Sequence, residues 1–173
     1  MRKLAVVHFP NLNLKEINSF RQRYDPSWKI IAPHITILFP VSGISKSQAI
    51  AQLGSIAKAT KSFPLSLHGL IKSFDDYLFL QVGSGSQEII DLHHRLESEM
   101  NISDLTRDIK FLPHLTLGYF RGKNNEFDKI AYDKAYEDAS KININSSSVF
   151  NNFTLIEGDG VSPAKEIKTF FLS

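Results

Sequence analysis

A five-residue phrase that occurs twice constrains this chain more than any other feature of its sequence. Residues 33–37 read Pro-His-Ile-Thr-Ile and residues 113–117 read Pro-His-Leu-Thr-Leu, so the copies lie 80 positions apart in a chain of 173 residues. Side chains two positions apart on a β-strand point to the same face of the sheet. Each copy therefore presents an imidazole beside a hydroxyl, backed by an apolar face. If the two strands oppose each other across a cleft, two imidazoles meet at one polar site.

The repeat also predicts how the whole chain is organised. Each half contains strands, helices and one His-x-Thr strand, so we expect two lobes related by a pseudo-two-fold axis. Short connections favour antiparallel pairing. Hydrophobic periodicity and turn residues indicate strands over 3–9, 34–39, 63–73, 77–82, 114–120, 149–157 and 166–172. Helices are indicated from Asn13 to Tyr24, from Ser45 to about Thr60, through Ile89–Met100 and over 126–140.

Capping residues predict where two of these helices begin. Asn13 with Glu16, and Ser45 with Gln48, have the spacing of a capping box. The strand over 34–39 is expected to end at Pro40, because proline donates no backbone hydrogen bond to the ladder.

The last third of the chain gives two further structural predictions. Residues 149–157 and 166–172 are expected to pair as closing strands around a Gly158-Asp159-Gly160 turn. The helix over 126–140 should turn four apolar side chains inward: Phe127, Ile130, Ala131 and Ala135.

Composition restricts the class of protein. The chain has no cysteine, which excludes disulfides, thiolate metal sites and a thiol nucleophile and fits a reducing cytoplasm. No run approaches the roughly 18 apolar residues of a membrane span. The apolar run after Arg2 and Lys3 is too short for a signal peptide. We therefore expect a cytoplasmic protein that does not interact with membranes.

The net charge of +2 is unevenly distributed. Residues 1–74 carry ten basic and two acidic side chains, whereas residues 75–173 carry ten basic and sixteen acidic ones. The basic half could attract an anion such as phosphate or RNA, but no polybasic cluster occurs, so a solvated surface with interleaved charges is the simpler interpretation. Arg23 and Asp25 are expected to form a local ion pair that holds the turn after the first helix.

A single His-x-Thr phrase on a strand is usually an ordinary packing feature, but two copies in matched context point to function. The paired motifs resemble those of the 2H phosphoesterase superfamily, which includes 2'-5' RNA ligase-like proteins and 2',3'-cyclic nucleotide phosphodiesterases. Residues 21–28, Arg-Gln-Arg-Tyr-Asp-Pro-Ser-Trp, are similar to a small bacterial branch. The resemblance implies an α+β fold in which two pseudo-symmetric lobes of mainly antiparallel sheet, with outer helices, surround a central cleft. Residues 1–173 would form one such domain with interleaved lobes.

The resemblance also implies the catalytic residues. The two family histidines correspond to His34 and His114, and the hydroxyl residues to Thr36 and Thr116. Some relatives continue after the second motif with Ala-Arg, whereas this chain has Gly-Tyr at 118–119.

Imidazoles suit the chemistry that the resemblance implies, because histidine titrates near pH ~6.5. A neutral imidazole can take a proton from water, and a charged one can protonate the ribose oxygen that leaves a cyclic phosphate. The threonine hydroxyls can donate to the non-bridging oxygens. No metal or other cofactor is required. Which histidine is acid and which is base stays open.

Three further residues are candidates for substrate binding. Arg121, the first arginine after the second motif, is the preferred additional phosphate contact. Tyr119 lies near the end of the same strand and could contact ligand or solvent. Trp28, six residues before His34, could stack on a base, although a sole tryptophan is more often a core residue.

The other histidines have simpler interpretations. Strand parity places His8 in the core or at the floor of the cleft, with core packing preferred. His68 could line the cleft, but a structural role is slightly favoured. His93 falls on the apolar stripe of its helix, and His94 should meet solvent. No spacing indicates a metal site.

The preferred function is a metal-independent phosphodiesterase acting on a 2',3'-cyclic phosphate or a 2'-5' linked nucleotide or RNA end. The alternatives are RNA 2'-5' ligation, a nucleotide- or RNA-binding module without turnover, and, third, a metal hydrolase. The expected partner is such a nucleotide or RNA end. No obligate protein partner is indicated, and a monomer is expected.

Overall fold

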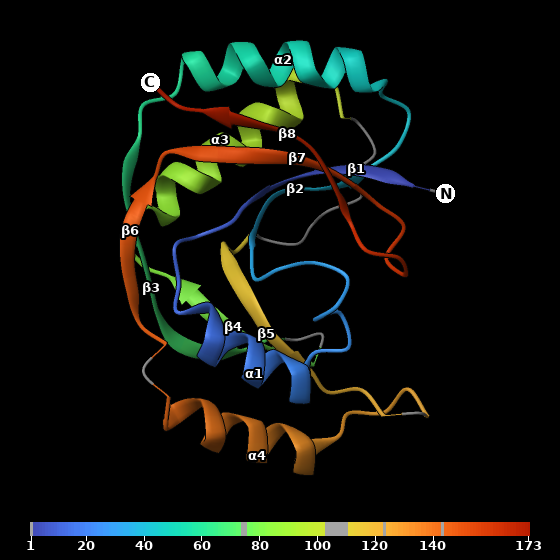
Figure 1. The fold of residues 1–173 in the computed structure, drawn as a ribbon, viewed down its shortest axis with the longest axis vertical. Coiled ribbons are helices and arrows are strands. Elements are labelled where there is room, and N and C mark those ends of the chain that lie inside the picture. The colour runs from blue at the N-terminus through green and yellow to red at the C-terminus, as the bar shows by residue number, and fades with distance from the viewer. Residues whose placement is uncertain (1, 74–75, 103–110, 123, 143) are drawn as a thin grey trace.

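The two His-x-Thr segments form neighbouring strands at the centre of one curled sheet. The computed structural model describes residues 2–73, 76–102, 111–122, 124–142 and 144–173. Within these residues, eight antiparallel strands follow the order β6-β3-β4-β5-β2-β1-β7-β8, and four helices pack on them (Figure 1). In chain order the elements are β1 (Lys3–His8), α1 (Leu14–Tyr24), β2 (Ile35–Val41), α2 (Lys46–Lys58), β3 (Phe63–Lys72), β4 (Tyr77–Val82), α3 (Ser86–Glu99), β5 (His114–Tyr119), α4 (Lys129–Ser140), β6 (Ser146–Phe150), β7 (Asn152–Gly158) and β8 (Lys165–Phe171).

The pairing of β2 with β5 relates the two lobes. Ile35 lies directly opposite Leu115 in an antiparallel register. From this pair the order repeats outward, with β1, β7 and β8 beyond β2 and with β4, β3 and β6 beyond β5. The α+β fold with two pseudo-symmetric lobes is therefore confirmed. The two motif strands lie side by side in one sheet as hydrogen-bonded neighbours.

The helices cross between the two halves. α1 precedes β2 in the chain but packs on β5, and α3 precedes β5 but packs on β2. α2 contacts β8 and α4 contacts β3, so α2 and α3 gather at one end of the molecule and α1 and α4 at the other (Figure 1). Each central strand is thus covered by a helix from the other half of the sequence. No helix in the described ranges is long and apolar enough to cross a membrane.

Strand alternation separates the core from the side of the sheet that carries the motif. Ile35 and Leu115 are fully buried in the main hydrophobic core between sheet and helices, and the apolar residues two positions later join them. The motif histidines and threonines point the other way and are half-buried. We call this second side the open face. Val7 lies opposite Thr36 and belongs to a small second cluster on this face. That cluster comprises Ala5, Val7 and Ile156, with Phe9, Ile31 and Ala164 packed against it.

The prediction of one strand over 149–157 is wrong, because two strands occupy this stretch. β6 pairs with β3 at one edge of the sheet, whereas β7 pairs with β1 and β8 near the other edge. The chain changes partner at Asn151, which lies outside both strands. Alternation of apolar residues reports which side a strand buries but not which strand it pairs with. The pairing of β7 with the 166–172 segment is confirmed.

One predicted capping box is confirmed and one is wrong, and the start of the last helix is corrected. Ser45 and Gln48 form the predicted capping box at α2. Asn13 precedes α1 but its side chain makes no capping hydrogen bond. α4 begins at Lys129, after Asp128 accepts a hydrogen bond from the N–H of Ala131. Ile130 is 84% exposed, against the prediction that it is buried, because the buried residues of α4 are Ala135 and Ala139, four apart, and Ile130 lies off that line. β2 also continues through the predicted stop at residue 40 to Val41.

A buried ion pair holds the turn after α1. The Arg21 guanidinium lies 2.7 Å from the Asp25 carboxylate, and both side chains are almost fully buried. Asp25 also accepts from the N–H of Ser27, and Arg21 donates to the carbonyl of Ile31 at 3.0 Å. The predicted partner, Arg23, points away and pairs instead with Asp138 of α4. The predicted pair is wrong, because a helix places residues four apart on one face and residues two apart on different faces.

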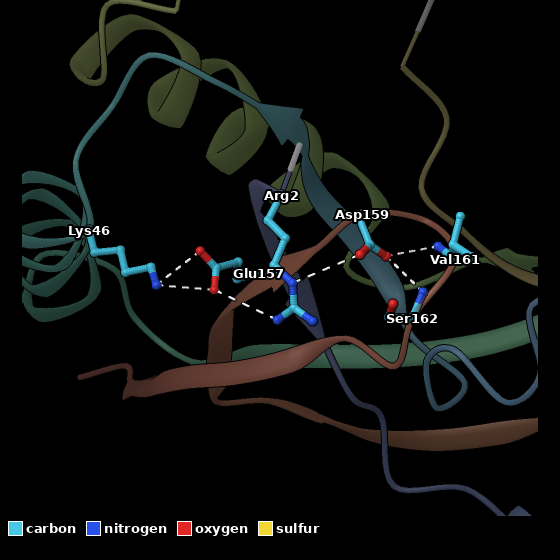
Figure 2. A network of polar contacts seen from close by, with 6 residues as sticks. All are labelled: Arg2, Lys46, Glu157, Asp159, Val161 and Ser162. Atoms are coloured by element: carbon cyan, nitrogen blue, oxygen red, sulfur yellow. Dashed lines mark hydrogen bonds and ion pairs between the residues drawn. The ribbon is translucent and has the colours of Figure 1, made fainter.

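The turn between β7 and β8 is held by a network of charged side chains (Figure 2). Arg2 lies 4.0 Å from Glu157 and 3.9 Å from Asp159. Two backbone N–H groups of the turn donate to the Asp159 carboxylate, and these bonds lower its pKa to about 2. Asp159 therefore stays charged across the physiological range. The remaining members of the network are Lys46, which contacts Glu157, and Val161 and Ser162, which supply the two N–H groups.

Removing the charge of Asp25 should destabilise the protein far more than removing that of Arg23. Asp25→Asn leaves the Arg21 cation buried without its counter-charge, and we expect a loss of about 3 kcal/mol or more in the free energy of unfolding. Arg23→Ala removes a partly exposed ion pair and should cost at most about 1 kcal/mol. Urea denaturation of both variants measures the difference. Equal losses would show that the buried pair has no special role in stability.

Candidate active site

The register of β2 and β5 brings the four motif side chains together. Because Ile35 opposes Leu115, an antiparallel ladder places Thr36 opposite His114 and His34 opposite Thr116, all on the open face. Directly opposed residues have Cβ atoms about 4.5–5.5 Å apart, and the two histidines are diagonal neighbours at roughly 7–8 Å. Two imidazoles and two hydroxyls therefore lie close together on the open face.

Both imidazoles are oriented in the same way. Nδ1 of His34 lies 2.9 Å from the carbonyl oxygen of Ala32, and Nδ1 of His114 lies 2.6 Å from that of Leu112. A carbonyl only accepts, so each Nδ1 carries the donated proton and each Nε2 has its lone pair free. The prolines between these carbonyls and the histidines keep the preceding residue extended, which aims each carbonyl back at its ring. The repeated proline therefore has a direct part in the site.

Burial and neighbouring charges keep the imidazoles neutral. Burial is the main cause that lowers the pKa of His34 to about 4, and the Arg21 guanidinium and the His114 ring act in the same direction. The hydrogen bond to Ala32 and the charge of Asp25 oppose this shift. Burial also lowers the pKa of His114. Near pH 7 both free imidazoles are neutral, and a bound phosphate anion would raise both pKa values.

Aromatic side chains support the site, more closely on one side than on the other. The His114 ring stacks on Phe79, with ring centres 3.6 Å apart, and Tyr77 links Phe79 to Tyr119 at 4.5 Å. Among the residues that the structure describes, His34 has one aromatic neighbour, Phe9, edge-on at 6.4 Å. The two ends of this pseudo-symmetric site are therefore chemically different.

Gly118 explains why this chain departs from the Ala-Arg continuation of some relatives. A Cβ at this position would lie 2.7 Å from the ring of Phe120 and 3.0 Å from the carbonyl oxygen of Tyr24. Only glycine lets α1 approach β5 this closely, so the substitution reflects packing behind the motif strand.

The structure places the three predicted substrate-binding residues differently. Tyr119 lies on the open face beside Tyr77, in the aromatic group that supports His114. Trp28 lines a pocket next to His34. Arg121 lies beyond the end of β5, where its guanidinium pairs with Asp76 at 3.0 Å. It is not a free cation in this structure.

The remaining histidines lie mostly as expected. His8 is buried, bonds through Nδ1 to the carbonyl of Asn152 and packs against Phe150 with the two rings tilted. His93 is buried and bonds to the carbonyl of Ile37, while His94 and His68 are exposed. Within the described ranges no three His, Asp or Glu side chains gather as a metal site.

Sequence reasoning missed two groups that shape the site. Phe79 lies under His114. It is two residues from Tyr77 on one strand, so the sequence could have indicated that the two side chains lie on the same face. The guanidinium of Arg21 lowers the pKa of His34. The turn after α1 brings the two residues close together, and no local sequence pattern indicates this.

A pocket of 310 Å³ adjoins the His34 end of the site. It lies between the segment after α1 and the turn joining β7 to β8, on the open face. The lining residues are Phe9, Asn18, Trp28, Lys29, Ile30, Ile31, Ala32, Ile156, Ala164 and Glu166.

A curled antiparallel sheet with paired His-x-Thr strands at its centre defines the two-histidine phosphoesterases, and comparison with known proteins identifies the family. The model of the 2'-5' RNA ligase superfamily matches residues 9–160. This chain belongs to that superfamily.

Named relatives and solved structures agree with this assignment. A Bacillus pumilus (strain SAFR-032) protein named "Putative phosphoesterase" is 31% identical over 124 residues, covering 66% of this chain and 68% of its own. A Bacillus cereus (strain B4264) protein of similar name is 30% identical over 122 residues, covering 67% and 69%. The structure of E. coli LigT complexed with 3'-AMP superimposes with a TM-score of 0.64 at 19% identity, covering 99% of this chain and 98% of that one.

The two motif histidines should titrate unusually low in the free protein. We expect NMR titration to give His34 a pKa of about 4 and His114 a pKa below 6.5, because burial disfavours both imidazolium ions. Inorganic phosphate should raise both values, since an anion between the rings stabilises the charged forms. A His34 pKa at or above 6.5 would contradict the described environment.

Proposed function

We propose that this protein is a metal-independent phosphodiesterase acting on a 2',3'-cyclic phosphate, or on a 2'-5' linked nucleotide or RNA end, by two-histidine acid–base catalysis. One observation carries the proposal. Two imidazoles with Nε2 free, and two threonine hydroxyls beside them, share one face of adjacent strands at a spacing that fits a phosphate. Family membership supports phosphoester chemistry at this position.

The mechanism follows from the residue types. Nε2 of one imidazole takes a proton from water, whose oxygen attacks phosphorus, while the other imidazole, protonated on Nε2, gives its proton to the departing ribose oxygen. Thr36 and Thr116 donate hydrogen bonds to the non-bridging oxygens as negative charge grows on them. A bound phosphodiester raises the pKa of both imidazoles and so supplies the protonated partner. Either histidine can take either part.

Related structures and the aromatic residues of the site support nucleotides as the ligand class. Solved LigT structures are complexed with 3'-AMP, ATP and phosphate. Tyr119 and Trp28 offer aromatic surfaces at opposite ends of the site, on which a base can stack. Arg121 would contact phosphate only after releasing Asp76, so we assign it a secondary part.

Joining of RNA ends is the second candidate, because the family model that matches carries that activity in its description. The same imidazoles with exchanged roles would add a 5'-hydroxyl to a cyclic phosphate. The size of the product formed from RNA fragments distinguishes the two directions.

Removal of either motif imidazole should abolish most of the activity. We expect His34→Ala and His114→Ala to reduce kcat/KM on 2',3'-cyclic nucleotides by about 10²–10⁴-fold, the usual contribution of a general acid or base. Thr36→Val and Thr116→Val should weaken the reaction with the fold retained. His94→Ala, on the exposed side of α3, is the matched control, and activity should persist in EDTA. Full activity of both histidine variants would refute the proposal.

The pH profile of kcat/KM should be bell-shaped with an optimum below pH 6.5. The base must be neutral and the acid protonated, and both imidazole pKa values in the free protein lie below 6.5. The profile of kcat should move to higher pH, because the bound phosphodiester raises the pKa values. Steady-state rates from pH 4 to 9 on one cyclic nucleotide test both statements. An optimum of kcat/KM at or above pH 7.5 would contradict them.

A further inference from the structure

The pocket beside His34 is lined in part by the chain segment that leads directly to this histidine. Ala32 lines the pocket, and its carbonyl accepts the Nδ1–H of His34. Phe9 also lines the pocket, and its ring lies 6.4 Å from the His34 ring. A group bound in this pocket therefore lies beside the His34 ring.

We propose that this pocket is the subsite that holds the nucleobase of the substrate. The inference rests on the proposed function, since it places the organic part of the ester whose phosphate lies between His34 and His114. It also narrows the substrate class to phosphoesters that carry a base on the His34 side.

Both walls of the pocket are held in place before any ligand binds. On one wall, the buried Arg21 donates to the carbonyl of Ile31 at 3.0 Å, and the N–H of Trp28 donates to the carbonyl of Asp25 at 3.1 Å. The other wall contains Ala164, on the turn that the network around Asp159 holds (Figure 2).

A backbone hydrogen bond joins the two walls directly. The N–H of Ala164 donates to the carbonyl of Ile30 at 2.8 Å. The pocket thus binds a ligand without first having to order a loop, which lowers the entropic cost of binding.

The lining suits an uncharged aromatic ring better than a second phosphate. The apolar part of its surface comes from the second cluster, through Phe9, Ile31, Ile156 and Ala164. One cation and one anion, Lys29 and Glu166, lie among the lining residues, so the pocket has no excess of positive charge. The Lys29 ammonium is already engaged over the Trp28 ring at 5.1 Å.

The remaining polar side chains can form hydrogen bonds with the edge of a base. The side chains of Asn18 and Glu166 make no hydrogen bond or ion pair with any residue in the described part of the chain, so both are available to a ligand. Together they offer an amide, which donates and accepts, and a carboxylate, which accepts. The volume of 310 Å³ lies at the lower end for ligand pockets, which matches one base rather than a dinucleotide.

Trp28 is the sole tryptophan, so its fluorescence reports directly on this pocket. Titration with adenosine, which has no phosphate, should give saturable quenching, whereas ribose should give none. The double variant His34→Ala/His114→Ala should keep the adenosine response, which makes this measurement independent of catalysis. Ala164→Phe, which fills the pocket, should abolish the response, and Val161→Phe, exposed on the same turn, is the matched control that should retain it.

Kinetics provide the second measurement. We expect wild-type protein to prefer 2',3'-cyclic AMP over glycerol 1,2-cyclic phosphate, and Ala164→Phe to reduce this preference by at least about tenfold, the usual effect of losing a stacked base. If Ala164→Phe does not fold by circular dichroism, the exposed variant Glu166→Ala replaces it, and adenosine binding should weaken severalfold. Absence of adenosine quenching in the wild type overturns the subsite, as does quenching that survives in folded Ala164→Phe. Quenching without turnover of either cyclic phosphate overturns the proposed function and keeps the subsite.

Discussion

The pairing of Ile35 with Leu115 is the contact on which the rest of this structure depends. It sets the register of the two central strands, and a shift of one residue would turn each imidazole into the core and each isoleucine or leucine out. The contact between β2 and β5 is short, so the outer pairings with β1 and β4 must hold both strands in place. The helices also hold the central strands in place, since α1 and α3 each cover the central strand of the other half. The site is therefore complete only when both halves of the chain are folded.

The electrostatics of the site follow from the same arrangement. Both imidazoles lie on a sheet surface where neighbouring side chains exclude much of the water, which disfavours their charged forms. The Arg21–Asp25 pair stabilises the turn before β2 and also places a guanidinium near His34. The two charges of this pair act on the pKa of His34 in opposite directions, the guanidinium lowering it and the Asp25 carboxylate raising it. A negatively charged ligand would raise the pKa of both imidazoles and so favour their protonated forms.

Symmetry of the strands does not extend to their surroundings. His114 rests on Phe79 and the tyrosines beyond it, whereas His34 borders a preformed pocket bounded by segments from both ends of the chain. A cyclic phosphate ester is itself asymmetric, with a ribose on one side and solvent on the other. A pseudo-symmetric pair of imidazoles with unlike flanks can hold such a ligand in one orientation, and this is the physical basis for proposing a base subsite at one end only.

Sequence alone determined the repeated motif, the face that each motif residue shares, most helix and strand positions and the superfamily, because these depend on local periodicity and on short motifs. It did not determine that 149–157 is two strands with different partners, that Arg21 rather than Arg23 binds Asp25, or that Ile130 is exposed. The adjacency of the two histidine strands, the aromatic support of His114 and the pocket beside His34 also came only from the tertiary structure. Each of these joins segments far apart in the chain, and which segments meet is decided by packing of the whole sheet rather than by any local pattern.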